Sequence, residues 1–207
     1  MRYKAILFDL LTALLDSWSL WDAVAASPEL GRAWRAAYLR RTYGCGDYRP
    51  YETLVAEAAA ETGLPVPLAA TLAARWDALL PWPEAPSVLA ALARQHALGV
   101  VTNCSTALGA RAAQALGVPF RVVVTAEDAG AYKPDPRPYR RAVAALGLAR
   151  DEILFVAGSG FDLFGTAAVG LPTVWHNRVD LAAPAGAPTP LATWRSLDSL
   201  PGFVAAP

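Results

Sequence analysis

A regular alternation of short apolar runs with longer amphipathic segments constrains the fold of this chain more than any other feature. Strands are predicted at residues 98–101, 121–125, 153–156 and 173–175, and helices at residues 87–95, 105–116, 136–146 and 162–169. Short buried strands that alternate with helices are typical of a parallel sheet covered on both faces. A further apolar run, residues 5–8, ends at Asp9 and predicts one more buried strand. The predicted fold is α/β, with a Rossmann-like, doubly wound parallel sheet as its core.

A helical insertion separates the first predicted strand from the others. Three helices are predicted in it, each with a proline at or near its start and a glycine or proline beyond its end, at residues 27–41, 50–62 and 67–80. No strand pattern occurs among them. The insertion ends at a stiff, proline-rich connector, residues 81–86.

These patterns predict two domains. We expect a discontinuous α/β core domain of residues 1–14 and 84–207, and an inserted all-helical cap domain of residues 15–83. The tail from residue 180 onwards is rich in alanine and proline, and only residues 191–200 suggest a last strand.

Composition excludes several classes of protein. Of the 207 residues, 55% are hydrophobic and 17% are charged, which suits a packed core and not a disordered chain. The formal net charge of zero removes the basic surface that binding to nucleic acid or to an anionic membrane requires. Two cysteines cannot build a disulfide framework, and Asp9 and Asp162 interrupt the two apolar runs that resemble export or membrane signals. We expect a cytoplasmic protein without nucleic-acid or membrane partners.

Polar side chains follow four of the predicted strands, at or after the point where each strand ends. In chain order they are Asp9, Thr102 with Asn103, Lys133, and Ser159 with Asp162. Ligands of open α/β sheets bind at the carboxyl ends of the strands, so we expect these groups to converge. Lysine is rare in this chain, because Lys4 and Lys133 are the only lysines among its 18 basic residues. An ammonium is a compact charge whose pKa can be tuned, unlike a guanidinium.

The order of these residues resembles the haloacid dehalogenase superfamily, and within it most closely the L-2-haloacid dehalogenases. Phe8-Asp9-Leu10 is similar to the nucleophile motif of that family, and Thr102-Asn103-Cys104-Ser105 to its Ser-Asn-Gly-Ser. Residues 132–139 resemble its lysine motif with a trailing tyrosine, here Tyr139, and residues 155–162 with 170–178 resemble its last motif. In the insertion, Trp34-Arg35 matches a Trp-Arg pair whose arginine holds the departing halide.

The resemblance implies a covalent mechanism on a small 2-haloacid. Asp9 would attack the halogen-bearing carbon and expel halide, and water would then cleave the resulting ester. Burial alone would raise the pKa of Asp9, so Lys133 is needed to keep it ionised. Asp162 would hold the lysine and share in activating water, and Arg35 would bind the halide.

The remaining site residues are expected to bind substrate or position water. Thr102 and Asn103, with the amides that open the next helix, would bind the substrate carboxylate. The apolar wall would comprise Leu10, Leu11 and Leu39. Tyr139 either binds substrate or packs on its helix, and the water would be positioned by Thr12 or Ser159. We expect no metal and no cofactor. A homodimer is expected from family analogy alone.

Two alternatives stay open at this point. A magnesium-dependent phosphatase of this superfamily has a second aspartate two positions after the nucleophile, where this chain has Leu11, and an acidic pair where residues 157–162 offer only Asp162. A catalytically weakened protein with a binding role is the other alternative. It is motivated by two departures from the family: Thr12-Ala13 replaces Gly-Thr, and residues 157–159 lack the serine and asparagine near the hydrolytic water.

Overall fold

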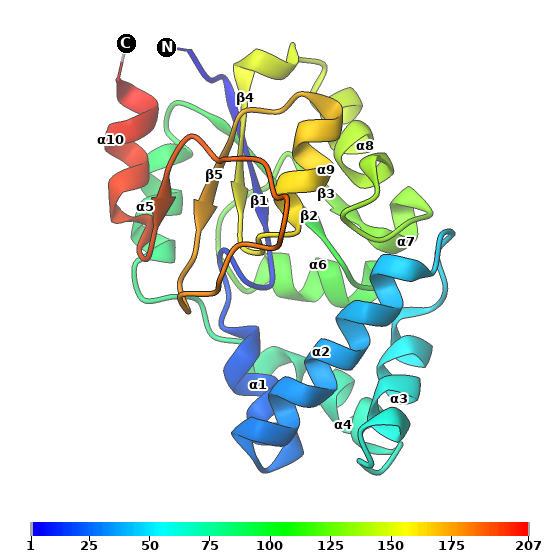
Figure 1. Cartoon of the computed structure of the whole chain (residues 1–207). Helices are drawn as coiled ribbons and strands as arrows, with labels where there is room; N and C mark the ends of the chain where they lie inside the picture. The colour runs from blue at the N-terminus through cyan, green and yellow to red at the C-terminus, as the bar shows by residue number, and fades with distance from the viewer. Residues whose placement is uncertain (1, 207) are drawn as a thin grey trace.

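A parallel sheet forms the centre of the molecule. The computed structural model describes residues 2–206. Within them the sheet has the strand order β3-β2-β1-β4-β5-β6, and all neighbouring strands are parallel. The strands are β1 (Ala5–Asp9), β2 (Ala97–Thr102), β3 (Val122–Thr125), β4 (Ile153–Ala157), β5 (Thr173–His176) and β6 (Thr193–Trp194) (Figure 1). The chain adds strands outwards on one side of β1 and then crosses to β4 on the other. This order confirms the predicted doubly wound α/β fold and opens a crevice at the carboxyl ends of β1 and β4.

Helices cover both faces of the sheet, because successive side chains of a strand point to opposite faces. On one face, Leu7 of β1 and Phe155 of β4 pack with α8 (Pro136–Leu146) and α9 (Asp162–Val169). On the other face, Phe8 packs in a cluster that includes residues of three further helices. These are α5 (Ala85–Leu92), α6 (Thr106–Gln114) and α10 (Leu200–Ala205). Both faces are therefore buried, as the unbroken apolar strands require.

Local capping explains where the helices begin and end. Asp135 accepts a hydrogen bond from the Arg137 amide at the start of α8, and Gly147 ends the helix with a left-handed φ of 66°. α7 (Ala126–Ala129) replaces the loop expected after β3, because Thr125 and Asp128 form a capping box. The last strand is shorter than residues 191–200. Ser196 caps a 3₁₀ turn at Leu197–Ser199, and α10 follows directly.

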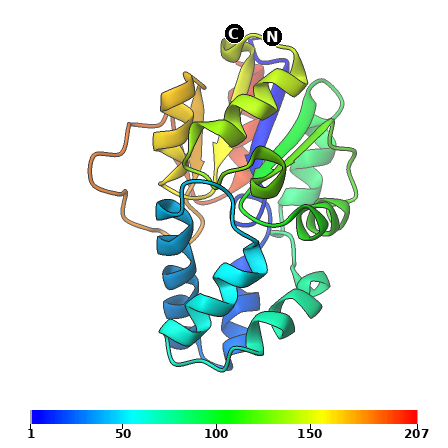
Figure 2. The same cartoon turned by 90° about the vertical axis from the view of Figure 1, so that its right-hand side faces the viewer.

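The insertion lies at the carboxyl ends of the strands, in the blue-to-cyan lower part of Figures 1 and 2. It comprises α1 (Ser17–Ala25), α2 (Pro28–Gly44), α3 (Tyr51–Glu61), α4 (Leu68–Ala74) and a 3₁₀ turn at Trp76–Ala78. The sequence patterns did not single out α1, which begins where Asp16 accepts a hydrogen bond from the Ser19 amide. Aromatic side chains form the core of the insertion, where the rings of Trp21 and Trp34 lie 4.7 Å apart.

Antiparallel contacts hold together the two segments that connect the insertion to the sheet. Leu15 and Pro81 form an isolated bridge, and the Trp82 amide donates to the carbonyl of Leu14 over 3.0 Å. The entering and leaving segments are thus held side by side. Among residues 2–206, no helix is long and apolar enough to cross a membrane.

Candidate active site

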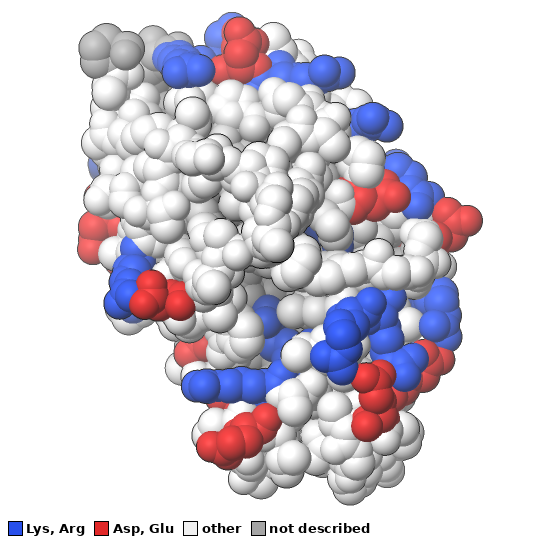
Figure 3. All heavy atoms as spheres, in the orientation of Figure 1, with Lys and Arg blue, Asp and Glu red and all other residues white. Residues whose placement is uncertain are grey.

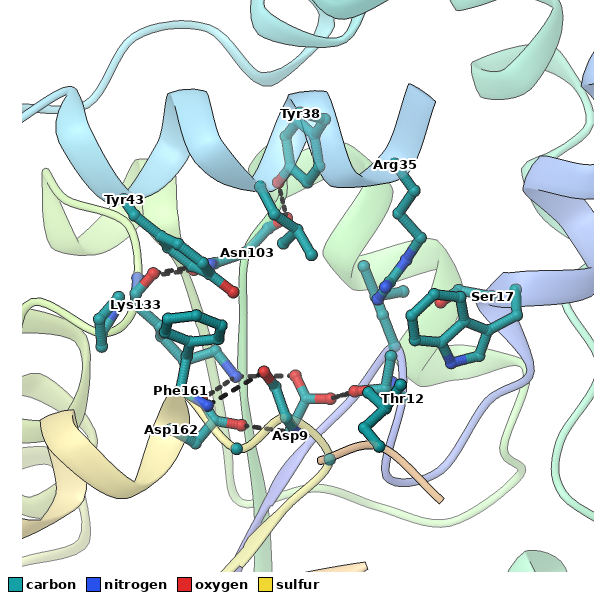
Figure 4. A pocket seen from close by; sticks show the side chains of 18 of the residues that line it. Asp9, Thr12, Ser17, Arg35, Tyr38, Tyr43, Asn103, Lys133, Phe161 and Asp162 are labelled. Carbon is teal, nitrogen blue, oxygen red and sulfur yellow. Dashed lines mark hydrogen bonds and ion pairs between the residues drawn. The ribbon is translucent and has the colours of Figure 1, made fainter. Parts of the chain in front are cut away.

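A cavity of about 140 Å³ lies where the insertion meets the carboxyl ends of β1 and β4. The surface is hollowed between these two parts of the molecule, and a close view shows the side chains that line the cavity (Figures 3 and 4). The sheet side of its wall includes Asp9, Lys133 and Asp162, and the insertion side includes Arg35 and Leu39. This volume lies below the roughly 300–1,000 Å³ of pockets that hold drug-sized ligands, so the cavity suits a smaller molecule.

Asp9 is held by hydrogen bonds on both carboxylate oxygens. Its Oδ1 accepts from Lys133 Nζ over 2.7 Å. Its Oδ2 accepts from the amides of Thr12 and Ala13 over 2.9 and 3.2 Å, and from the Thr12 hydroxyl. Burial is the largest influence and raises the pKa of Asp9, but the charge of Lys133 and the hydrogen bonds from Lys133 and Thr12 together hold that pKa below its usual value. The buried carboxylate is therefore ionised at neutral pH.

The turn after β1 creates this arrangement. The amides of Leu14 and Leu15 donate to the carbonyl of Leu10, so the chain curls back and its amides point at Asp9. Gly158 allows the turn to fit, because a Cβ there would lie 2.3 Å from Thr12 Oγ1 and 2.4 Å from the Ala13 amide nitrogen. The Thr12 hydroxyl thus donates a hydrogen bond to Asp9, whereas the sequence suggests that it positions water.

Lys133 lies between two buried carboxylates. Its Nζ is 2.7 Å from Asp9 Oδ1 and 3.0 Å from Asp162 Oδ1. The pKa of Lys133 is raised, because these two carboxylates outweigh burial, which alone would lower it. The pKa of Asp162 is also raised, by burial first and by the charge of Asp9, against the opposing effect of Lys133. Asp9 therefore ionises before Asp162, and Asp162 retains a greater affinity for a proton.

Tyr139 and Asn103 orient this trio. The Tyr139 hydroxyl donates to Asp162 Oδ1 over 2.8 Å, and Tyr139 is fully buried outside the cavity wall. Asn103 lines the cavity, but its amide donates to the Lys133 carbonyl over 3.0 Å and accepts from the Lys133 amide over 2.7 Å. Both ends of the side chain hold the backbone of Lys133, and the second hydrogen of the amide nitrogen is not used by these bonds.

Two other expected binding residues lie away from the cavity. Thr102 is completely buried, and its hydroxyl is 3.7 Å from Cys104 Sγ. Leu10 is also completely buried and packs into the hydrophobic core, because the turn after Asp9 directs it away from the wall. Part of the expected anion site at the start of α6 is occupied as well, since the Thr106 amide donates to Glu127 over 2.7 Å. The side chains of Thr102 and Leu10 therefore do not contact a ligand in this cavity.

One face of α2 supplies the opposite wall. Arg35, Leu39 and Tyr43 recur every four residues, so they share a face of the helix, and all three line the cavity. The Arg35 guanidinium is buried and stacks on Trp18, with 3.7 Å between its central carbon and the ring centroid. Burial is the largest influence on the pKa of Arg35 and lowers it. Among the described residues no carboxylate pairs with Arg35, whereas Arg40 on the same helix pairs with Glu61.

Several lining residues were not predicted from the sequence. Leu11 and Ser159 line the cavity as expected, but so do Tyr43, Phe161 and a tail segment that includes Leu181. The rings of Tyr43 and Phe161 lie 4.5 Å apart and bridge α2 and the start of α9. Helical spacing from Arg35 could have identified Tyr43. No local pattern marks the tail.

The donor set does not fit a magnesium site. Mg²⁺ needs oxygen ligands around an open position, but the ammonium of Lys133 lies between the two carboxylates that would supply them. No cluster of three or more metal-ligating side chains occurs in residues 2–206. Cys104 is not a thiolate nucleophile either, because burial raises the pKa of its thiol to about 12.

Known proteins resemble this chain in sequence and in structure. The sequence profile of the haloacid dehalogenase-like hydrolases matches residues 3–170. Haloacetate dehalogenase H-2 of Moraxella sp. (strain B) is 29% identical over 221 aligned positions, covering 99% of each chain. The (S)-2-haloacid dehalogenase of Xanthobacter autotrophicus is 29% identical and covers 94% of this chain and 85% of its own. The solved structure of an L-2-haloacid dehalogenase superposes with a TM-score of 0.87 at 26% identity, covering 100% of both chains.

Proposed function

The chain belongs to the haloacid dehalogenase-like hydrolases, and on that premise we propose that it is a 2-haloacid dehalogenase acting on small 2-haloalkanoic acids. The full-length relatives named as haloacetate and (S)-2-haloacid dehalogenases support this substrate class. One observation carries the proposal: an ionised, buried Asp9 faces a small cavity whose opposite wall holds a cation without a counterion. Such a pairing suits displacement of an anionic leaving group.

In the first step, Asp9 Oδ1 attacks the halogen-bearing carbon. Oδ1 is the freer oxygen, because it accepts one hydrogen bond while Oδ2 accepts three. A new carbon–oxygen bond forms as the carbon–halogen bond breaks, and the halide leaves with the bonding electrons towards Arg35. Leu11 and Leu39 keep this end of the cavity apolar, which strengthens the interaction of the halide with the guanidinium.

In the second step, water attacks the ester carbonyl carbon of Asp9. The negative charge then develops on Oδ2, where the amides of Thr12 and Ala13 and the Thr12 hydroxyl already point. Donors positioned in this way stabilise an oxyanion without reorganisation. Asp162 lines the cavity and has a raised pKa, so it accepts the proton of the water. Collapse releases the 2-hydroxy acid and restores the Asp9 carboxylate. Ser159, whose hydroxyl is at the cavity wall, is the candidate for positioning this water.

Isotope labelling tests the covalent route. With enzyme in excess over 2-chloropropionate in heavy-oxygen water and no added metal, one label should enter the peptide that contains Asp9, while the product receives its hydroxyl oxygen from the enzyme. Label found only in the product would mean direct attack of water and would contradict the proposal. Asp9→Asn should release no chloride, whereas Asp151→Asn, at an exposed position, should match the parent protein.

The same assay separates the alternatives. Hydrolysis of a phosphate ester that depends on magnesium, without halide release, would favour the phosphatase. Binding of a 2-haloacid without turnover would favour a weakened protein with a binding role. A homodimer and a cytoplasmic location are further proposals by family analogy, and sedimentation of the purified chain tests the first of them.

A further inference from the structure

Two residues that line the cavity carry a buried hydroxyl group with no hydrogen-bond partner among the described residues. The two groups are Ser17 Oγ and the Tyr51 hydroxyl, and each residue is only 2% exposed. An unpartnered buried hydroxyl is costly, so most such groups in native proteins are satisfied by protein or by a bound molecule. The mechanism described above uses neither group.

Both residues line the same cavity as Arg35, whose cation is unpaired among the described residues. Ser17 precedes Trp18, whose ring stacks on the guanidinium. Tyr51 is close enough to Arg35 for the two side chains to influence each other's pKa: Tyr51 raises that of Arg35, and Arg35 opposes the rise in that of Tyr51. The three side chains come from the starts of α1 and α3 and the middle of α2. Figure 4 shows Arg35 and Ser17 at one end of the site, away from the Lys133–Asp162 side of Asp9.

We propose that the hydroxyls of Ser17 and Tyr51 join Arg35 as hydrogen-bond donors to the departing halide, and that they make the site selective for the smaller, more charge-dense halide. The inference rests on the proposed function. A halide must leave on the side opposite the attacking oxygen, which places it towards Arg35 and not beside Lys133. Donors from three helices suit a spherical anion, since such an ion has no preferred direction for its hydrogen bonds.

The proposal predicts a dependence on the leaving group. Chloride is smaller than bromide, accepts stronger hydrogen bonds and leaves carbon less readily. Donors that act on the departing halide therefore accelerate a 2-chloro acid more than the corresponding 2-bromo acid. Removing them should lower the rate for both substrates, and the chloro substrate should lose more.

A double variant and a matched control test this dependence. In Ser17→Ala/Tyr51→Phe, kcat/KM for 2-chloropropionate should fall by about tenfold or more, the size expected when hydrogen bonds to a charged group are lost. The ratio of kcat/KM for 2-chloropropionate to that for 2-bromopropionate should fall with it, because the bromo substrate loses less. The control, Ser19→Ala/Tyr3→Phe, removes one hydroxyl from the same helix and a second buried, unpartnered tyrosine hydroxyl outside the cavity. Its ratio should equal that of the parent protein. The melting temperature of the Ser17/Tyr51 variant should be equal to or higher than that of the parent, because no hydrogen bond within the protein is lost.

A binding measurement makes the result independent of turnover. At constant ionic strength, replacing sulfate by chloride should raise the melting temperature of the parent protein and of the control, and should raise it less in the Ser17/Tyr51 variant. An unchanged substrate ratio would overturn the proposal. An equal rise in KM for both substrates would overturn it too, since the hydroxyls would then bind the carboxylate. If the parent releases no halide but its chloride-specific stabilisation is lost in the variant, the proposed function fails and the halide site stands.

Discussion

At the scale of single residues, the candidate site depends on one ammonium that serves two carboxylates. Lys133 Nζ lies within 3.0 Å of both Asp9 and Asp162, and all three side chains are buried. Such a trio is stable only as a set, because removal of the cation leaves two buried carboxylates without a counter-charge. The residue that makes Asp9 reactive should therefore also determine how stability depends on pH.

Lys133→Met should abolish most activity and reverse the pH dependence of stability that Asp9 contributes. In the parent protein the folded pKa of Asp9 is lowered, so its contribution to stability is present above the unfolded pKa and is lost as pH falls through the folded pKa. In the variant, burial remains and raises the pKa of both carboxylates, so stability is lost as pH rises instead. We expect a destabilisation of about 3–5 kcal/mol at pH 8 that shrinks towards pH 4, and a fall in kcat of about 100-fold or more at neutral pH.

Urea unfolding between pH 4 and pH 8, with halide release at each pH, measures both effects. The chain offers a matched control in Lys4→Met, because Lys4 is the other lysine and its side chain, 60% exposed, pairs with Glu152. The control should keep its activity and lose little stability. A Lys133 variant whose stability deficit stays constant over this pH range would contradict the coupling.

The sequence predicts which residues meet at the strand ends, but it does not predict the directions in which the neighbouring side chains point. Asp9, Lys133 and Asp162 follow strands, and the topology of a parallel sheet brings strand ends together whatever the loops do. The directions of Leu10 and Thr102 depend on how each turn curls, and here both pack inwards. Orientation after a strand is fixed by tertiary contacts that no local pattern contains.

At the scale of elements, α2 is the helix whose side chains line the cavity from the insertion side. Its residues 35, 39 and 43 face the cavity, while Trp34 on an adjacent face donates its indole N–H to the carbonyl of Val55 over 2.9 Å. This bond and the aromatic packing of the insertion fix the rotation of the helix. The position of Arg35 is therefore set by its neighbours on α2 and α3 and not by an ion pair.

Arg35→Met should separate catalysis from stability. The variant keeps the aliphatic bulk but removes a buried charge that has no anionic partner among the described residues, so the melting temperature should stay the same or rise. The loss of a donor that acts mainly in the transition state should lower kcat by about 100-fold. Stopped-flow measurement of halide release, with thermal unfolding of the same sample, tests both parts.

Arg40→Met is the matched control on the same helix. Arg40 is exposed and pairs with Glu61, so its replacement should change kcat little and stability by less than about 1 kcal/mol. A normal kcat in Arg35→Met, with or without a change in stability, would exclude Arg35 from the departure of the halide.

Elements with strong end signals were predicted almost to the residue. α8 and α9 have the bounds predicted at residues 136–146 and 162–169, and a glycine in the left-handed conformation follows each helix. α1 and α7 were missed, because α1 follows an apolar turn without a break and α7 has only four residues. The tail was unreadable because β6 has only two residues and depends on pairing with β5.

At the scale of the whole molecule, we propose that the insertion and the sheet are separate cooperative units, with the bounds 15–83 for the cap and 1–14 with 84–207 for the core. The Trp82 amide of the cap donates to the Leu14 carbonyl of the core where the chain passes between them. Backbone and side-chain hydrogen bonds also cross between them, such as those from the Tyr48 amide to the Gly130 carbonyl over 2.9 Å and from the Tyr38 hydroxyl to the Asn103 carbonyl over 2.8 Å. The halide site proposed above, by contrast, is built by three helices of the insertion.

Hydrogen exchange of the intact protein should reveal these two units. Amides of α1–α4 should exchange together through an opening that costs less free energy than exchange of β1, β2 and β4, because contiguous units of lower stability open below the global free energy. Chloride should slow exchange in α1, α2 and α3 and leave β5 and α10 unchanged, since it binds where those three helices meet. Equal protection in both parts, falling together in denaturant, would mean one cooperative unit. If the two parts open separately, a chloride effect as large in the sheet as in α1, α2 and α3 would place the anion away from Arg35, since a ligand stabilises most strongly the unit that must open to release it.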